Sequence, residues 1–191
     1  MNQKNLLEVD WSQIPAPADD GAAAHLKGMA VPPIGLVATD DTLVTLSALP
    51  GRTVVFGYPR TGEPGKIALV DDWDMIPGAR GCTPQTCAFR DLFAELKAAG
   101  AAQVFGLSTQ SNAYQTEMAS RLHLPFPVLS DEKLLLTRAL DLPTMEVADL
   151  TLIKRLALII DNARVTHVFY PVFPPDRNAG DVLAWLKENP V

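Results

Sequence analysis

The segment Gly81-Cys82-Thr83-Pro84-Gln85-Thr86-Cys87-Ala88-Phe89-Arg90-Asp91 contains both cysteines of this 191-residue chain. Apolar residues continue with helical spacing as far as Leu96, which predicts that the segment opens a helix. The glycine before Cys82 marks the end of a loop, and Pro84 is tolerated only near the start of a helix. We therefore place Cys82 in the first turn of the helix.

This position makes Cys82 a candidate nucleophile. Unpaired backbone N–H groups and the helix dipole favour an anion at a helix start, and the thiolate is the reactive form of cysteine. In an intact helix the Cα atoms of Cys82 and Cys87 would be roughly 8–9 Å apart, whereas a disulfide needs less than ~7 Å. A bond between the two would require the first turns to unwind. The alternative is that both cysteines are small buried apolar residues.

A metal site is less well supported by the sequence. The Cys-x4-Cys spacing is loose for zinc, and the thioredoxin-type Cys-x-x-Cys motif is absent. The histidines His25, His123 and His167 are scattered along the chain without a second ligand pair. We therefore expect no metal site.

Outward from the cysteines, apolar runs and helical patterns alternate. Thr53–Tyr58 and Gln103–Ser108 are typical of buried strands, and the last pair of strands is joined by a short turn. The predicted strands cover 42–46, 53–58, 103–108, 126–130, 155–161 and 165–170, and the predicted helices 83–99, 111–122, 132–140 and 178–187. This order predicts an α/β fold, with a central mixed sheet flanked by helices.

The first thirty or so residues carry few regular signals. We interpret residues 1–35 as an N-terminal arm, with Trp11 and Ile14 as anchors, and residues 36–191 as the folded domain; a partly mobile tail is the alternative. A long irregular stretch from 59 to 81 follows the second predicted strand, and loops of this length are often functional.

Composition narrows the class of protein. The chain is 48% apolar and 20% charged, which suits one globular domain, and its net charge of −6 argues against nucleic acid as the main partner. No apolar run approaches the roughly 20 residues that span a bilayer. Residues 1–5 show no secretory signal, so we expect a cytoplasmic location and no membrane partner.

Four motifs in order resemble the peroxiredoxins, most of all their Q-type, or bacterioferritin-comigratory, branch. The segment 81–91 resembles the active-site helix of that branch, and 104–111 its strand ending in a Ser-x-Asp-Ser turn, with Gln110 in place of the acid. The segment 124–131 resembles its Leu-x-Phe-Pro-Leu-Leu-Ser-Asp motif, and Arg155 stands where the family has an arginine before the strand ending in Ile-Asp.

The resemblance implies a thioredoxin fold with peroxiredoxin-type additions and a thiol peroxidase activity. By resemblance, Cys82 is the peroxidatic cysteine, Cys87 the resolving cysteine, and Arg155 the residue that holds the thiolate and the peroxide oxygens. A thioredoxin-like or glutaredoxin-like protein would reduce the disulfide. No cofactor is implied, and the family includes monomers and homodimers.

The sequence departs from the family where proline and threonine precede the peroxidatic cysteine. Ala79 stands in the threonine position, whereas Pro59 and Thr61 resemble the start of the motif, displaced by an insertion. Either Pro59 and Thr61 reach Cys82 across the inserted loop, or the pocket is rebuilt, with Pro77 or Thr83 as substitutes. A rebuilt pocket would suit a second hypothesis, a redox sensor or binding module with weak peroxidase activity. A third is a metal-binding chaperone of the thioredoxin fold.

Overall fold

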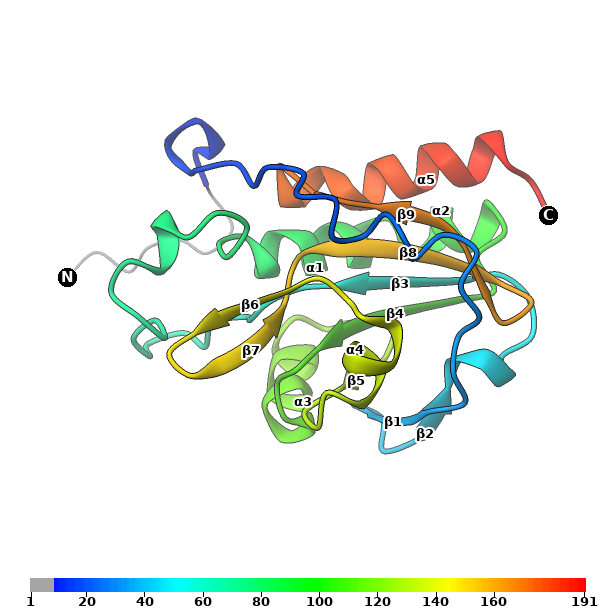
Figure 1. The fold of residues 1–191 in the computed structure, drawn as a ribbon, viewed down its shortest axis with the longest axis horizontal. Helices are drawn as coiled ribbons and strands as arrows, with labels where there is room; N and C mark the ends of the chain where they lie inside the picture. The colour runs from blue at the N-terminus through cyan, green and yellow to red at the C-terminus, as the bar shows by residue number, and fades with distance from the viewer. Residues whose placement is uncertain (1–8) are drawn as a thin grey trace.

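The computed structural model describes residues 9–191, in which a seven-stranded sheet is covered on both faces (Figure 1). Residues 1–8, including those we searched for a secretory signal, lie outside the description. The strands are β1 (Gly35–Ala38), β2 (Leu43–Thr45), β3 (Thr53–Gly57), β4 (Gln103–Ser108), β5 (Val128–Ser130), β8 (Leu156–Asp161) and β9 (Arg164–Phe169), and a separate hairpin contains β6 (Thr144–Val147) and β7 (Leu150–Ile153). The helices are α1 (Cys82–Asp91), α2 (Phe93–Ala98), α3 (Asn112–Arg121), α4 (Leu135–Leu140) and α5 (Asn178–Glu188), and the short 3-10 helices are η1 (Trp11–Gln13), η2 (Leu46–Ala48), η3 (Trp73–Met75) and η4 (Pro175–Arg177).

The sheet is mixed, with strand order β2-β1-β5-β4-β3-β8-β9. Strands β3, β4 and β5 run parallel, while β8 is antiparallel to β3, and β1 is antiparallel to both β2 and β5. Strand β3 lies between β4 and β8, and all five of its residues are buried. A strand covered on both faces has no solvent side, which explains its continuous apolar run.

Alternation along β3 sends its side chains into two cores. Val54 and Phe56 pack with residues of α1, α2 and α5, whereas Val55 faces the opposite core, which includes Leu136 and Leu140 of α4. Phe56 stacks on Phe89 of α1 with a ring-centroid distance of 4.0 Å. This stack fixes α1 on the sheet through a contact worth more than burial alone.

The predicted elements are confirmed in type, with two additions and one interruption. The helix predicted over 83–99 is divided at Leu92 into α1 and α2. The hairpin β6–β7 was not predicted, because its turn residues Ala148 and Asp149 adopt φ values of 48° and 61° without the glycine or asparagine that marks such turns. Strand β1 was also missed, and it pairs with both β2 and β5.

The N-terminal segment contributes to the core before β1 begins. Ala23, Leu26 and Val31 are buried with residues of the main sheet, and Ala30 pairs with Arg164 of β9. Residues 23–31 therefore pack as part of the domain, although we drew the boundary after residue 35. Trp11 is anchored, as predicted: its ring contacts Phe173 edge-on, and its Nε1 donates to the Asp176 carboxylate at 2.9 Å.

Figure 1 shows three segments gathered at one end of the molecule: the dark-blue start of the described chain, the loop between β3 and α1, and the yellow β6–β7 hairpin. This end is where the parallel strands finish and where loops of α/β proteins usually form sites. Within residues 9–191, no helix has the length and apolar character needed to cross a membrane.

Candidate active site

Cys82 is the first residue of α1, as the sequence predicts, and Gly81 is the helix N-cap. Gly81 has a φ of 103°, a conformation that disfavours any residue with a Cβ. A Cβ there would also lie 2.6 Å from the Cγ of Pro175 and 2.7 Å from a ring carbon of Trp11. Both the backbone conformation and the packing therefore require glycine immediately before the cysteine.

Sheet register brings Arg155 to Cys82. Gly57 at the end of β3 pairs with Leu156 at the start of β8, so Arg155 lies beside the point where the chain leaves β3. Its Nη2 donates to the Cys82 Sγ at 3.3 Å, and both residues are almost fully buried. A permanently charged donor at this distance stabilises an anionic sulfur.

The Arg155 guanidinium also holds the loop before Cys82. Nη2 lies within 3.3 Å of three backbone carbonyl oxygens, those of Gly78, Ala79 and Arg80. The Cys82 thiol itself contacts the Ala79 carbonyl at 3.5 Å. Ala79 therefore contributes its backbone at the position where the family has a threonine side chain.

Two buried amides orient the guanidinium, and sequence reasoning did not select either of them. Gln85, one turn after Cys82, accepts a hydrogen bond from Arg155 Nη1 through its Oε1. Its Nε2 donates to the Asn178 Oδ1 at 2.9 Å, and Gln85 and Asn178 are both almost fully buried. Gln85 could have been selected because it lies one helical turn after Cys82. Nothing in the sequence around Asn178 indicated a role in the site.

Tyr58 directly follows β3 and lies in the same buried cluster as Cys82. It is completely buried and its hydroxyl donates to the Gln115 Oε1 at 2.9 Å. Burial raises the pKa of Tyr58 well above its usual value, and the charge of nearby Cys82 raises it further. Tyr58 therefore stays a neutral donor and does not compete with Cys82 as an anion.

Cys87 is a free, buried thiol in the second turn of α1. Burial is the main cause that raises the pKa of Cys87, and Arg90 opposes it. Cys82 is also free. The structure therefore shows the dithiol form, with α1 intact.

Pro59 and Thr61 belong to a different cluster of contacts. Thr61 is buried, and both its N–H and its hydroxyl donate to the Gln110 Oε1, at 3.0 and 3.1 Å. The Pro59 carbonyl accepts from the Ser108 hydroxyl at 3.2 Å. Within residues 9–191 no hydrogen bond links Pro59 or Thr61 to Cys82. Gln110, which replaces the family's acid, is the residue that holds Thr61.

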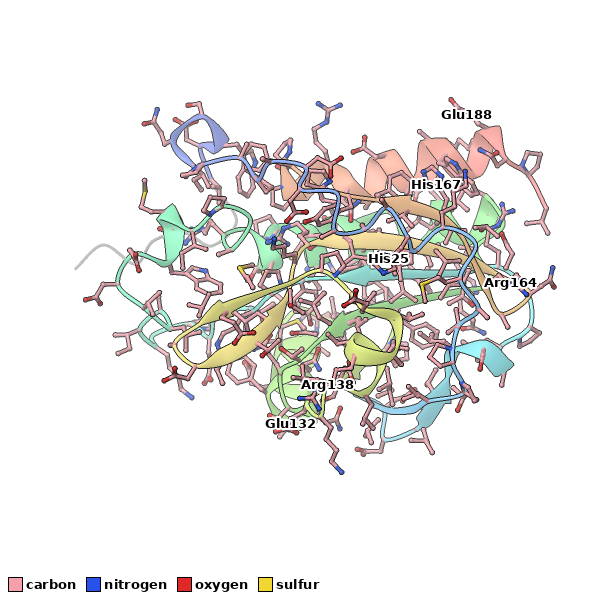
Figure 2. The ribbon with its side chains drawn as sticks, viewed as in Figure 1. His25, Glu132, Arg138, Arg164, His167 and Glu188 are labelled. Carbon is pink, nitrogen blue, oxygen red and sulfur yellow. The ribbon has the colours of Figure 1, made fainter. Side chains whose placement is uncertain are left out.

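The acidic residues of the inserted loop are exposed or paired with a cation. Asp71 and Asp72 are exposed, and Asp74 pairs with Arg80 at 3.1 Å. The described part of the chain contains no cluster of three potential metal ligands among its histidines, cysteines and carboxylates. Figure 2 labels His25 and His167 on different elements: His25 contacts the Leu140 carbonyl, and His167 stacks on Trp185.

Comparison with known proteins gives the same assignment. The Redoxin family model matches residues 26–183. A peroxiredoxin Q from Sedum lineare is 32% identical over 165 residues, covering 84% of this chain and 77% of that protein. The chain belongs to the Redoxin family, as a peroxiredoxin of the Q type. A putative peroxiredoxin Q of Oryza sativa subsp. indica is 34% identical over 165 residues, and this chain covers 66% of its length.

Solved peroxiredoxins share the fold. The peroxidoxin BcpB of Mycobacterium tuberculosis superposes with a TM-score of 0.70 at 26% identity, covering 87% of this chain and all of that one. Peroxiredoxin Q of Xanthomonas campestris superposes with a TM-score of 0.65 at 25% identity, covering 82% and 90%. The predicted thioredoxin-like fold with peroxiredoxin additions is therefore confirmed.

We predict that Gln85 is a positioning residue for Arg155. In Gln85→Met the guanidinium loses its Nη1 acceptor and Asn178 loses its donor, which leaves two buried polar groups unpaired at a cost of about 1–3 kcal/mol each. We expect a lower melting temperature and a peroxide reaction slowed by about tenfold. Gln85→Glu keeps an acceptor for Arg155 and should orient the guanidinium, but its negative charge disfavours the Cys82 thiolate, so we expect it to recover only part of the rate constant for peroxide oxidation. Equal rates in wild type and Gln85→Met, measured by stopped flow, would contradict the role.

We predict an alkaline shift in the reactivity of Cys87. In Cys82→Ser, Cys87 is the one remaining thiol, and burial favours its neutral form. We measure alkylation of Cys87 by iodoacetamide with mass spectrometry over a range of pH. The pH at which alkylation increases should be higher for the folded variant than for the same variant unfolded in urea. Because the folded chain holds the Cys87 proton more tightly than the unfolded chain, the free energy of unfolding should also fall as the pH rises through the alkaline range. Superimposed pH profiles for the folded and unfolded chains would refute this prediction.

Proposed function

We propose that this chain is a two-cysteine thiol peroxidase that reduces hydrogen peroxide or organic hydroperoxides. One observation carries the proposal: the Cys82 Sγ lies at the N-terminus of α1, 3.3 Å from the Arg155 guanidinium. The backbone dipoles at the start of the helix stabilise a thiolate, and the fixed charge of the guanidinium stabilises it further. The family membership supports the same chemistry.

In the first step the Cys82 thiolate attacks one oxygen of the peroxide, and the O–O bond breaks. The sulfur is oxidised to a sulfenic acid, and the other oxygen leaves as water or an alcohol after it takes up a proton. Negative charge moves from the sulfur to the leaving oxygen. Arg155 is placed to stabilise that charge, since its donors are already aligned before the reaction begins.

In the second step the Cys87 thiol attacks the sulfur of the sulfenic acid. An S–S bond forms, the S–O bond breaks, and water leaves. Because both thiols are buried on one intact helix, the first turns of α1 must unwind for this step. The Cys82–Cys87 disulfide then exchanges with a dithiol donor, which supplies two electrons and is itself oxidised.

We further propose that the donor is a thioredoxin-like or glutaredoxin-like protein, and that the chain works as a monomer or homodimer. The two-cysteine arrangement supports a dithiol donor, since an intramolecular disulfide is reduced by a second pair of thiols. Residues 64–68 and 71–72 of the loop between β3 and α1 are exposed, which supports access by such a protein once α1 has unwound.

The test is a coupled assay with thioredoxin, thioredoxin reductase and NADPH. We expect NADPH consumption that depends on both the chain and hydrogen peroxide, followed by absorbance. A parallel assay with glutaredoxin, glutathione and glutathione reductase identifies the better donor. Consumption no faster than that of the reductase system alone in both assays would reject the peroxidase.

A further inference from the structure

The glycine that precedes Cys82 is enclosed by two rings, one from each end of the chain. A Cβ at Gly81 would lie 2.7 Å from a ring carbon of Trp11 in η1 and 2.6 Å from the Cγ of Pro175 in η4. Both rings therefore lie directly against the Gly81 backbone. That backbone has no free space on this side while the two rings stay in place.

The two rings are joined to each other. The Trp11 Nε1 donates at 2.9 Å to the carboxylate of Asp176, the residue that follows Pro175. The Trp11 ring also contacts the Phe173 ring edge-on, with a centroid distance of 6.0 Å. Trp11 and Pro175 thus form one connected clamp over Gly81, and we call this pair of residues the clamp.

Residues 11–20, which we call the N-terminal strap, are tied to the fold at both ends. Trp11 fastens the first end. At the other end the Asp20 carboxylate pairs with Lys154 at 2.6 Å and accepts from the Tyr170 hydroxyl at 2.7 Å. The match to the Redoxin family model begins only at residue 26. Half of the clamp is therefore supplied by a segment that lies outside that match.

The clamp opposes a movement that the second step of the proposed reaction requires. Cys82 and Cys87 are buried on an intact helix, so the first turns of α1 must unwind before a disulfide can form. Gly81 is the N-cap of this helix, with a φ of 103°, and unwinding changes its backbone conformation. The rings of Trp11 and Pro175 leave no room for that change beside Gly81.

We propose that Trp11 is a positioning residue that sets the lifetime of the Cys82 sulfenic acid, by holding the start of α1 folded. This inference rests on the proposed peroxidase function. While the clamp is closed, the sulfenic acid stays on the folded helix, where Cys87 does not reach it. The sulfenic acid then waits for the helix to unwind or reacts with a second peroxide.

The two fates of the sulfenic acid give different products. After unwinding, the Cys87 thiol displaces the oxygen from the Cys82 sulfur as water, and the disulfide forms. If a second hydrogen peroxide reacts first, the sulfur takes one of its oxygens and becomes a sulfinic acid, while the other oxygen leaves as water. The sulfur loses two electrons in this reaction, and the peroxide gains them. A closed clamp therefore favours the sulfinic acid, and an open clamp favours the disulfide.

The experiment treats the full dithiol chain with increasing concentrations of hydrogen peroxide, without a reductant, and measures the products by intact mass. The disulfide has no thiolate that could attack peroxide, so each chain ends in one of the two products. We define the midpoint as the peroxide concentration at which half of the chains carry a sulfinic acid. The midpoint equals the rate constant for disulfide formation divided by the rate constant for the second oxidation.

Three variants open the clamp to different extents. Trp11→Ala removes both the ring and the donor, and we expect it to raise the midpoint about tenfold. Trp11→Phe keeps an aromatic ring but donates nothing to Asp176, so its midpoint should lie between those of Trp11→Ala and wild type. Asp176→Ala changes only an exposed side chain and leaves the Trp11 ring in place, and it should raise the midpoint about threefold.

The matched control is Trp185→Ala, which removes another half-buried tryptophan. The Trp185 ring stacks on His167 and lies beneath the Arg52 guanidinium. We expect a lower melting temperature and the wild-type midpoint. An unchanged or lower midpoint in both Trp11→Ala and Asp176→Ala, or an equal rise in Trp185→Ala, would overturn the role of the clamp. Failure of wild type to form either oxidised product would instead reject the peroxidase itself.

Discussion

Replacing Cys82 by serine is expected to reduce peroxide turnover to the uncatalysed background. The change replaces only the sulfur atom by oxygen, and serine fits the same buried position at the start of α1. Its hydroxyl is a far weaker nucleophile than a thiolate at neutral pH. The measurement is NADPH consumption in the coupled assay, with the thermal melting of the variant as a test of folding.

The matched control is Cys87→Ser, which has the same chemical change five residues along the same helix. This variant should consume about one peroxide per chain and stop as a sulfenic acid, since no second thiol is present to displace the oxygen. With excess peroxide it should proceed to a sulfinic acid, detected by intact mass. Full turnover in Cys82→Ser, or identical behaviour of the two variants, would reject the roles that we propose for the cysteines.

Replacing Arg155 by methionine is expected to slow oxidation of Cys82 by about 10²–10³-fold, the cost of losing a donor aimed at developing charge. Methionine fills a similar volume but donates nothing to the Cys82 Sγ or to the loop carbonyls. Arg155→Lys should recover part of the rate because it keeps the charge, but it lacks the planar fork that serves the sulfur and Gln85 together. Stopped-flow oxidation of the dithiol form measures the rate constant.

Alkylation separates the two parts of the Arg155 effect. Iodoacetamide reacts with the thiolate and has no peroxide oxygen for the guanidinium to stabilise. We therefore expect Arg155→Met to slow alkylation of Cys82 less than it slows oxidation by hydrogen peroxide. Equal losses in both reactions would show that Arg155 acts on the sulfur alone, and an unchanged oxidation rate would exclude it from the site.

Local sequence signals were sufficient to place the candidate nucleophile, Cys82, at the start of a helix. Gly81, Pro84 and the apolar spacing after them placed Cys82 at the first residue of α1, because helix starts are specified by a few adjacent residues. The motifs in order identified the peroxiredoxin family, which the comparisons confirm. The expected cytoplasmic location stays a prediction, since no contact in the fold bears on it.

Other features of the fold and the site could not be predicted, because no local sequence pattern marked them. The β6–β7 hairpin turns at Ala148 and Asp149 without a glycine. Thr61 and Pro59 matched a family motif in sequence, but the inserted loop separates them from Cys82 along the chain, and Gln110 holds Thr61. A role for Pro59 and Thr61 beside Cys82 stays a prediction.

The sequence by itself determined the position of the candidate nucleophile at a helix start, the order of the main elements and the family. The family resemblance had already named Arg155, but only the tertiary structure gave its 3.3 Å contact with the Cys82 Sγ and revealed the supporting amides of Gln85 and Asn178. The physical reason is distance along the chain. A helix start depends on a few adjacent residues, whereas these contacts depend on the pairing of β3 with β8 and on packing between segments far apart in sequence.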